Sequence, residues 1–197
     1  EIIEEADINP SQIGSFVHAT TVATNTILEG KGAKTGLITT EGFRDVLEMR
    51  RIRIPDMYNL DYVKPRPLVD RRLRREISER IGPEGQIWKK LDEKSVRKVG
   101  QFFRDEGVES VAICLMHSYI NPSHEIKVME ILKEELHKEV FISCSHEILP
   151  EIREYERTST TVVNALLGPV VSQYLSILSS KLKSSGMVKP LQIMQSN

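Results

Sequence analysis

A continuous apolar run lies between two helical patterns in the second half of the chain, and this order limits the folds open to it. The run, SVAICLM at residues 110–116, has the length and composition of a strand buried on both faces. Before it, residues 92–106 place apolar side chains at helical spacing, with Asp92 as the expected N-cap. A second helical pattern at 123–137 and another short apolar strand at 140–143 follow it. Alternating helices and buried strands predict an α/β fold with a mixed, mainly parallel sheet.

The remaining segments extend the same alternation. Further strands are expected near residues 13–17, at 34–40 and at 190–194, and further helices at 20–29, 41–49 and from 150 to about 185. Gly168 and Pro169 are expected to kink or break the last helix, because proline cannot donate a backbone hydrogen bond. Two segments interrupt the pattern. Residues 50–72, rich in proline and arginine, predict an inserted loop, and residues 71–81 fit either a helix or a weak edge strand.

Composition excludes several classes of protein. The chain has 197 residues, of which 40% are hydrophobic and 28% charged, which is typical of a globular protein with a sizeable core. The net charge of −1 gives no general attraction to nucleic acid, and no apolar run is expected to span a membrane. Cys114 and Cys144 lie in apolar stretches, which predicts reduced, buried thiols and a cytoplasmic protein.

The stretch SFVHATTVATNT, residues 15–26, combines four threonines, a histidine and an asparagine where a strand passes into a helix. Thr20, Thr21, Thr24 and Asn25 recur at helical spacing and share part of one face. The backbone N–H groups at a helix start carry partial positive charge, so hydroxyls beside them could hold an anion or a polar substrate. Helix capping by Thr20 or Thr21 is the alternative, although a cap needs only one hydroxyl.

A second polar stretch, SCSHEILPEIREYERTST, occupies residues 143–160. Ser145, His146 and Glu147 come directly after a predicted strand, and the carboxyl ends of parallel strands are where α/β proteins bind ligands. The alternative is that Ser145 or His146 caps a helix whose acids and arginines, Arg157 among them, form salt bridges along its surface.

Other patterns favour structural roles. The glycines of GKGAKTG, residues 30–36, follow a helix and precede a strand, which is the reverse of a phosphate-binding loop. Neither Cys114 with His117 nor Cys144 with His146 supplies the four converging ligands of a zinc site, and no third group is evident that would support a cysteine nucleophile. We therefore expect no protein-bound metal site. The arginines of residues 50–75 lack interleaved aromatic residues, so we expect a salt-bridged surface or a subunit interface rather than a nucleic-acid site.

Long motifs in a fixed order resemble one protein family. Residues 18–51, HATTVATNTILEGKGAKTGLITTEGFRDVLEMRR, are similar to the H-G-T-T-V-A-T-N…G-A…T-x-G-F-R-D stretch of the hydantoinase A and 5-oxoprolinase family. Stretches at 113–125, 143–171 and 191–197 match the same family in the same order. The resemblance covers nearly the whole chain, and several long motifs in register are more specific than any single short pattern.

The resemblance implies an actin-like, ribonuclease H-like ATPase lobe and the ATP-dependent opening of a cyclic amide such as a hydantoin or 5-oxoproline. Phosphorylation of the amide oxygen activates the carbonyl carbon, and the step requires ATP and Mg²⁺. It further implies a hydantoinase B-type partner subunit or fused domain, and a homo-oligomer is compatible with it. In this reading His18, Thr20, Thr21 and Asn25 line a catalytic cleft. Substrate-binding residues are expected at Thr24, Ser145, His146, Glu147 and Arg157.

The chain also departs from the family pattern. It has no counterpart of the opening Asp-Gly-Gly-Thr phosphate motif, and it stops at Asn197, where the pattern continues into a second lobe. Ala19 stands where glycine is usual, and Arg75 where an aromatic residue is usual. We expect residues 1–149 to be the N-terminal domain without its first phosphate-binding segment. Residues 150–197 are expected to be a helical connection and the first strand of the second lobe. By itself this piece is expected to be inactive toward ATP.

Two other functions are compatible with these motifs. Subunits of ATP-dependent ketone carboxylases share the same lobe and differ in the molecule that is activated. Alternatively, the chain is a non-catalytic assembly module that docks a hydantoinase B-type partner through its arginine-rich insertion, residues 50–75.

Overall fold

The computed structural model describes residues 9–51 and 58–194, which form two compact units. The large unit comprises residues 33–169. The small unit comprises the described parts of residues 1–32 and 170–197. The helix α7 (Glu154–Ser184) begins in the large unit and ends in the small one.

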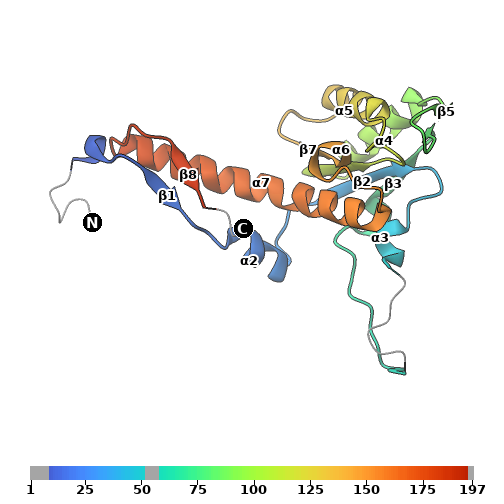
Figure 1. Ribbon diagram of the computed structural model, residues 1–197, viewed down its shortest axis with the longest axis horizontal. Coiled ribbons are helices and arrows are strands. Elements are labelled where there is room, and N and C mark those ends of the chain that lie inside the picture. The colour runs from blue at the N-terminus through green and yellow to red at the C-terminus, as the bar shows by residue number, and fades with distance from the viewer. Residues whose placement is uncertain (1–8, 52–57, 195–197) are drawn as a thin grey trace. The chain divides into compact units, whose positions relative to one another are not determined.

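Four parallel strands form the sheet of the large unit, in the order β3-β2-β6-β7 (Figure 1). They are β2 (Thr35–Thr40), β3 (Arg74–Ile77), β6 (Ser110–Cys114) and β7 (Phe141–Cys144). Every residue of β2 and β6 is buried, as expected for parallel strands covered on both faces. This confirms the predicted α/β class with a mainly parallel sheet, and the arrangement is consistent with an actin-like lobe.

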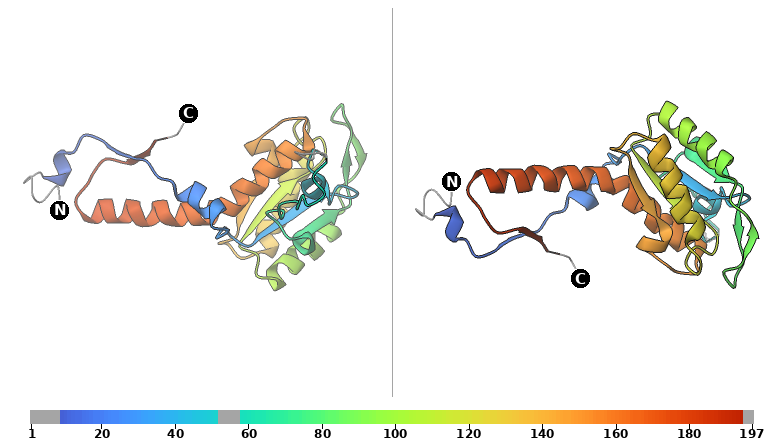
Figure 2. Two further views of the ribbon diagram at one scale, coloured as in Figure 1. Left: turned by 90° about the horizontal axis from the view of Figure 1, so that it is seen from below. Right: turned by 90° about the horizontal axis from the view of Figure 1, so that it is seen from above.

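Helices cover both faces of this sheet (Figure 2). On one face lie α4 (Glu93–Asp105) and α5 (Ser123–Glu135), and the first half of α7 covers the other. On the α4 side, Phe103 packs so closely over Gly36 that a Cβ added there would lie 2.6 Å from its ring. On the α7 side, the amide of Asn164 donates a hydrogen bond to Ser143 Oγ at 3.0 Å. The sheet is therefore the middle layer of three, and the apolar core lies on both of its faces.

Shorter elements complete the two units. In the large unit these are α3 (Val46–Met49), η2 (Arg71–Leu73), α6 (Ser145–Ile148) and an antiparallel pair of β4 (Arg80–Ile81) and β5 (Ile87–Lys89). The small unit contains η1 (Pro10–Gln12), α2 (Val22–Leu28) and a parallel pair of β1 (Phe16–His18) and β8 (Leu191–Ile193).

Several local predictions are confirmed. Asp92 caps α4, and its carboxylate accepts a hydrogen bond from the backbone N–H of Lys94 at 3.1 Å. Residues 82–85 form the expected turn between β4 and β5. Most of the arginine-rich segment is irregular, although residues 52–57 within it lie outside the described part of the chain.

Other predictions are wrong or are resolved by the structure. The helix expected at 41–49 shrinks to α3, because Gly42 has a φ of +88° and its N–H bonds to Glu76, which makes the segment a turn. The ambiguous residues 71–81 form η2 and two strands. The last helix begins at Glu154 rather than Pro150, and Pro169 does not break it. The carbonyl of Leu166, near the point where proline lacks a donor, accepts a hydrogen bond from the N–H of Ala33 at 3.0 Å.

One described helix, α7, is long and apolar enough to cross a membrane by length and composition, contrary to the sequence-based expectation. This is weak evidence for a membrane span, because core helices of soluble proteins share these properties. Its first half carries Val162, Ala165 and Leu166, which are buried in the large unit.

Candidate functional site

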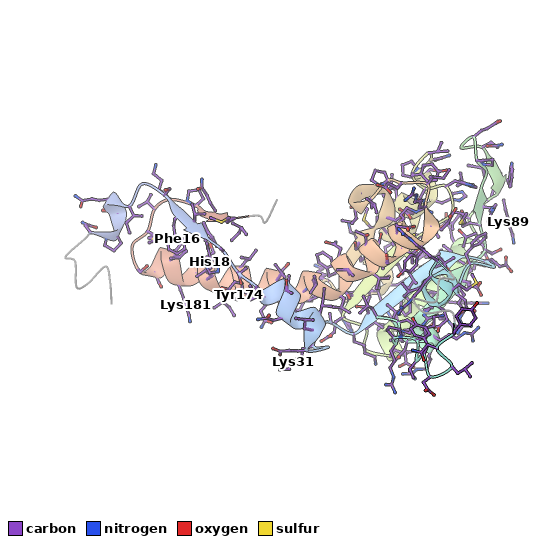
Figure 3. The ribbon with its side chains drawn as sticks, turned by 60° about the horizontal axis from the view of Figure 1, so that its bottom comes forward. Phe16, His18, Lys31, Lys89, Tyr174 and Lys181 are labelled. Atoms are coloured by element: carbon purple, nitrogen blue, oxygen red, sulfur yellow. The ribbon has the colours of Figure 1, made fainter. Side chains whose placement is uncertain are left out.

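The small unit positions His18 at the end of β1, where its ring faces a tyrosine of α7 (Figure 3). Its Nε2 lies 2.6 Å from the hydroxyl of Tyr174, and the two ring centroids are 5.8 Å apart. This hydrogen bond fixes the direction of the imidazole. Sequence reasoning identified His18 and missed its partner.

The predicted polar residues of α2 are exposed at or beside the start of the helix. Thr20 Oγ1 accepts a hydrogen bond from the N–H of Val22, the first residue of α2, at 3.2 Å, while Thr21 occupies the N-cap position without a side-chain cap bond. The amide of Asn25 donates to Thr21 Oγ1 at 3.3 Å. Within the described residues the hydroxyl of Thr24 has no hydrogen-bond partner. These side chains therefore combine a capping role with free donors, and their expected place beside a substrate cleft stays a prediction.

A fully buried carboxylate, that of Glu125 in α5, organises the second predicted group. One of its oxygens accepts hydrogen bonds from the N–H of Leu115 at 2.8 Å and from the hydroxyl of Ser145 at 2.6 Å. The other faces the N–H of His146 at 3.0 Å and its Nδ1 at 2.7 Å. Glu125 thus joins the carboxyl ends of β6 and β7 to the start of α5.

Arg157, on the first turn of α7, is the second large polar group at this end of the sheet and is 1% exposed. Its guanidinium donates hydrogen bonds to the carbonyl oxygens of Glu151 at 2.8 Å and Leu115 at 3.0 Å. It also lies 5.3 Å from the ring centroid of Tyr119. Its Nε has no partner among the described residues. The alternative role of Arg157, a salt bridge on the helix surface, is wrong, because the side chain is buried against backbone carbonyls, while its role in substrate binding stays a prediction.

A second buried carboxylate, that of Glu79, contacts His124, the residue directly before Glu125. Glu79 accepts a hydrogen bond from Thr40, the last residue of β2, and lies 2.7 Å from Nδ1 of His124. The hydroxyl of Thr40 in turn accepts from the N–H of Met116 at 2.9 Å. Of these two consecutive residues, the imidazole of His124 therefore pairs with a carboxylate, that of Glu79, and the carboxylate of Glu125 pairs with an imidazole, that of His146.

The surroundings change the acid–base chemistry of three groups. The pKa of His146 is raised above its ordinary value, chiefly by its hydrogen bond to Glu125. Burial raises the pKa of Cys144 to about 12 and also raises the pKa of Cys114. Both thiols are free and buried, so neither supplies a thiolate near neutral pH, which argues against a cysteine nucleophile.

The structure thus divides the predicted site residues into two groups. Ser145, His146 and Arg157 lie in or beside the Glu125 network, while Glu147 is 57% exposed and its carboxylate is 3.9 Å from His146 Nε2. His18 and the polar residues of α2 belong to the small unit. That both groups line one cleft stays a prediction. Sequence reasoning missed Glu79, His124 and Glu125.

Neither a metal nor a nucleotide has an evident cradle in residues 9–51 and 58–194. No group of three His, Cys, Asp or Glu side chains in these ranges is placed to hold a metal ion. Gly30, with a φ of +64°, ends α2 before β2 rather than opening a helix toward a phosphate. Gly30 and the residues that follow it therefore do not form a phosphate-binding loop.

Sequence profiles decide the family. The profile of the hydantoinase/oxoprolinase N-terminal region matches residues 1–136, and that of hydantoinase/oxoprolinase matches residues 157–197. The chain belongs to the hydantoinase/oxoprolinase family. Among its relatives in this family, an uncharacterised protein of Methanocaldococcus jannaschii is 44% identical over 99% of the chain. Caprolactamase subunit alpha of Pseudomonas jessenii is 39% identical over 100%, and a 5-oxoprolinase of Saccharomyces cerevisiae is 34% identical over 95%.

Solved structures agree with this membership of the hydantoinase/oxoprolinase family. The crystal structure of the ATP-dependent caprolactamase from Pseudomonas jessenii covers 99% of the chain with a TM-score of 0.90 and 37% identity. A nucleotide-free acetone carboxylase structure covers 95% with a TM-score of 0.83 and 28% identity. The chain spans 29% of the Methanocaldococcus protein, 27% of the caprolactamase subunit and 16% of the yeast 5-oxoprolinase. It spans 29% and 28% of the two solved chains.

Proposed function

We propose that this chain is part of an ATP-dependent enzyme that opens a cyclic amide of the hydantoin, 5-oxoproline or lactam type. The observation that carries the proposal is the agreement with an ATP-dependent caprolactamase over 99% of the chain, at a TM-score of 0.90. The 5-oxoprolinase relatives support the same substrate class, because caprolactam and 5-oxoproline are both cyclic amides.

An amide carbonyl is a poor electrophile, and this is why such a reaction uses ATP. Transfer of the γ-phosphoryl group to the carbonyl oxygen forms an O–P bond and releases ADP. Water then adds to the activated carbon, and the ring C–N bond breaks as the nitrogen takes up a proton, which leaves an acyl phosphate. A second water releases phosphate, which carries the original carbonyl oxygen, and leaves a carboxylate. Hydroxyl and amide donors beside the amide oxygen stabilise the charge that develops there. We propose this role for Thr20, Thr21 and Asn25, with His18, oriented by Tyr174, as the group that moves a proton.

A ketone carboxylase is the second candidate. It is supported by the acetone carboxylase structure and by a 35% identical acetophenone carboxylase gamma subunit. In the hydrolase, water attacks the activated amide, whereas a carboxylase joins an activated ketone to a carbon supplied by bicarbonate. A requirement for bicarbonate therefore distinguishes the two reactions. Because two relatives are named as subunits, we also propose a partner subunit, of the hydantoinase B type.

We also propose a cytoplasmic location, which the free, buried thiols support.

The test uses the intact enzyme with its partner subunit. We expect ADP release that depends on hydantoin, 5-oxoproline or caprolactam, does not need bicarbonate, and yields a ring-opened product by mass spectrometry. A cyclic amide labelled with ¹⁸O at the carbonyl should transfer the label to phosphate. ADP release that requires a ketone together with bicarbonate would contradict the hydrolase and support the carboxylase.

The roles of the α2 residues are tested by the double variant Thr20→Val, Thr21→Val in the same enzyme. We expect kcat to fall by at least tenfold with an unchanged unfolding midpoint, while Thr160→Val, an exposed threonine of α7, changes neither. Unchanged kinetics in the double variant would leave the two threonines as helix caps only.

The isolated 197-residue chain is expected to lack ATPase activity, and measurable turnover by it would contradict that expectation.

A further inference from the structure

A hollow of about 430 Å³ lies within the large unit, away from the residues that the proposed function uses. Its walls come from the turn after β2, from α3 and the two residues that follow it, and from the start of α7. Figure 1 shows α3 beside the first turns of α7. Ligands of parallel α/β sheets bind beyond the carboxyl ends of the strands, and a volume of about 300–1,000 Å³ is usual for small-molecule sites.

The floor of this hollow is apolar and is held in place by the turn after β2. Phe43 follows Gly42, whose φ of +88° only glycine adopts without strain, and the N–H of Phe43 bonds to the carbonyl of Thr40 at 3.0 Å. Arg80 stacks over the ring of Phe43 at 4.8 Å and fixes its orientation. The side chains of Val46, Met49 and Tyr155 complete the lining around it.

The rim is charged, and its charges do not balance. Arg51 is paired with Glu156. The guanidinium of Arg50 donates a hydrogen bond to a backbone carbonyl, that of Pro65, at 2.8 Å, and has no acidic partner among the residues that the structure describes. Arg153 is exposed and interacts electrostatically with Glu156, the same carboxylate that pairs with Arg51. Among the described lining residues, three arginines face the two carboxylates of Glu154 and Glu156, which leaves one net positive charge at the rim.

The backbone at this rim is strained. Arg50 has a φ of +57° and a ψ of −139°, a conformation that side-chain-bearing residues rarely adopt. Its N–H bonds to the carbonyl of Val46 at 3.0 Å, and together with the Pro65 contact this holds the strained residue at the mouth of the hollow. Strain of this kind persists where surrounding contacts impose it, and it concentrates at ligand sites.

From the volume, the apolar floor and the unbalanced arginines, we propose that this hollow binds a small molecule with an apolar body and one carboxylate. The body would lie against Phe43 and Met49. The carboxylate would pair with Arg153, because a guanidinium forms two parallel hydrogen bonds with a carboxylate and gives both affinity and orientation. This binding needs neither ATP nor turnover, so it stands or falls independently of the proposed function.

The test measures binding of two matched probes, benzoate and benzamide, to the intact protein without ATP, by calorimetry. The probes share a ring and differ only in the negative charge. We expect benzoate to bind at least tenfold more tightly than benzamide. Arg153→Gln should reduce this preference to less than twofold, because it removes the charge and keeps an amide. Arg97→Gln, which removes an exposed arginine paired with Glu134 and Glu135 elsewhere, should leave the preference unchanged.

Methionine methyl spectra locate the ligand. With ¹³C-methyl-labelled methionine, benzoate should shift the Met49 resonance and leave that of Met187, in the small unit, in place. Phe43→Leu keeps an apolar side chain and should weaken both probes by a similar factor. Equal affinity of the two probes, an unaffected preference in Arg153→Gln, or a Met49 resonance that does not respond to benzoate would each overturn the proposal.

Discussion

At the residue scale, the most consequential side chain is Glu125, which sequence reasoning missed. Its carboxylate is fully buried and meets four hydrogen-bonding groups from three residues, in the segment after β6 and at the start of α6. A signal for its burial was present. Glu125 lies three and seven residues before Val128 and Leu132, both fully buried, so it falls on the core face of the helix. The partners were not predictable, because Leu115 follows β6 and His146 lies in α6, and only the pairing of β6 with β7 brings both to Glu125.

Replacement of Glu125 by glutamine tests this account. An amide keeps the shape but turns one acceptor into a donor that faces other donors. We expect Glu125→Gln to lower the free energy of unfolding by about 2–4 kcal/mol, measured by urea denaturation. Glu147→Gln, which changes an exposed carboxylate next to the same histidine, should change it by no more than about 0.5 kcal/mol. Equal effects of the two substitutions would show that the Glu125 network contributes nothing specific.

The pKa of His146 gives a stability effect with a definite sign. Its pKa is raised above the ordinary value of 6.5, chiefly because its ring is hydrogen-bonded to Glu125. A group whose pKa is higher in the folded state binds its proton more tightly there. The stabilisation is therefore complete below about pH 6.5 and is lost as the pH rises through the raised pKa. We expect the difference in unfolding free energy between the native protein and His146→Gln to shrink over that window. A difference that grows with pH would contradict the assignment.

At the element scale, periodicity predicted most helices and strands, and failures have local causes. The residues of β3 read ambiguously because Arg74 and Arg75 interrupt the apolar pattern. Arg74 is nevertheless buried, paired with Glu48, and Arg75 stacks on Phe102 at 4.5 Å. The expected break at Pro169 did not occur, and α7 continues as one helix from Glu154 to Ser184.

The close packing of β2 against α4 makes Gly36 a sensitive position. Its substitution by alanine would place a Cβ 2.6 Å from the ring of Phe103. We expect Gly36→Ala to destabilise the protein by about 1–3 kcal/mol in urea unfolding, because a buried ring has little room to move. Gly14→Ala adds a methyl group with no atom within 4 Å and serves as the control. If the two variants were equally stable, the contact between β2 and α4 would have to be looser than described.

The predicted N-cap of α4 can be tested at the same scale. Asp92→Ala removes the side-chain acceptor of the Lys94 N–H and should cost about 1 kcal/mol. Asp92→Asn keeps an oxygen acceptor and should recover most of that loss. Thermal unfolding of the three proteins checks this order, and an asparagine variant as unstable as alanine would contradict the capping role.

At the scale of the whole molecule, the buried apolar core belongs almost entirely to the large unit. Its members run from Leu37 to Ala165, whereas among the described small-unit residues Met187 is the only buried hydrophobic side chain. The small unit has a two-stranded parallel sheet, which is not stable by itself. We expect the fragment Ala33–Pro169 to fold alone and unfold cooperatively in circular dichroism. Residues 9–32, as a peptide, should be unstructured. A fragment 33–169 without a cooperative transition would contradict this division of stability.

The fold class was predictable at this scale because alternation of elements depends on local sequence. The site was predictable only in part. Motif resemblance pointed to His18, Ser145 and Arg157 but not to their partners. These are the hydroxyl of Tyr174 for His18, the buried carboxylate of Glu125 for Ser145, and the backbone carbonyls of Leu115 and Glu151 for Arg157. It was also not predictable that His18 and the polar residues of α2 belong to the small unit and the other predicted site residues to the large one. No local sequence pattern marks the residue at which a chain leaves one unit and enters the other.

The inverse pairing of His124 with Glu79 and of Glu125 with His146 restricts how this segment can change in length. Inserting or deleting one residue just before α5 would rotate the helix start by about 100°. An insertion would bring His124 to the place of Glu125, opposite His146, and a deletion would bring Glu125 to the place of His124, opposite Glu79. Each change sets two groups of the same type against each other in a place closed to water. Variation in length among related chains should therefore avoid the connection between β6 and α5 and collect in the exposed turn between β4 and β5.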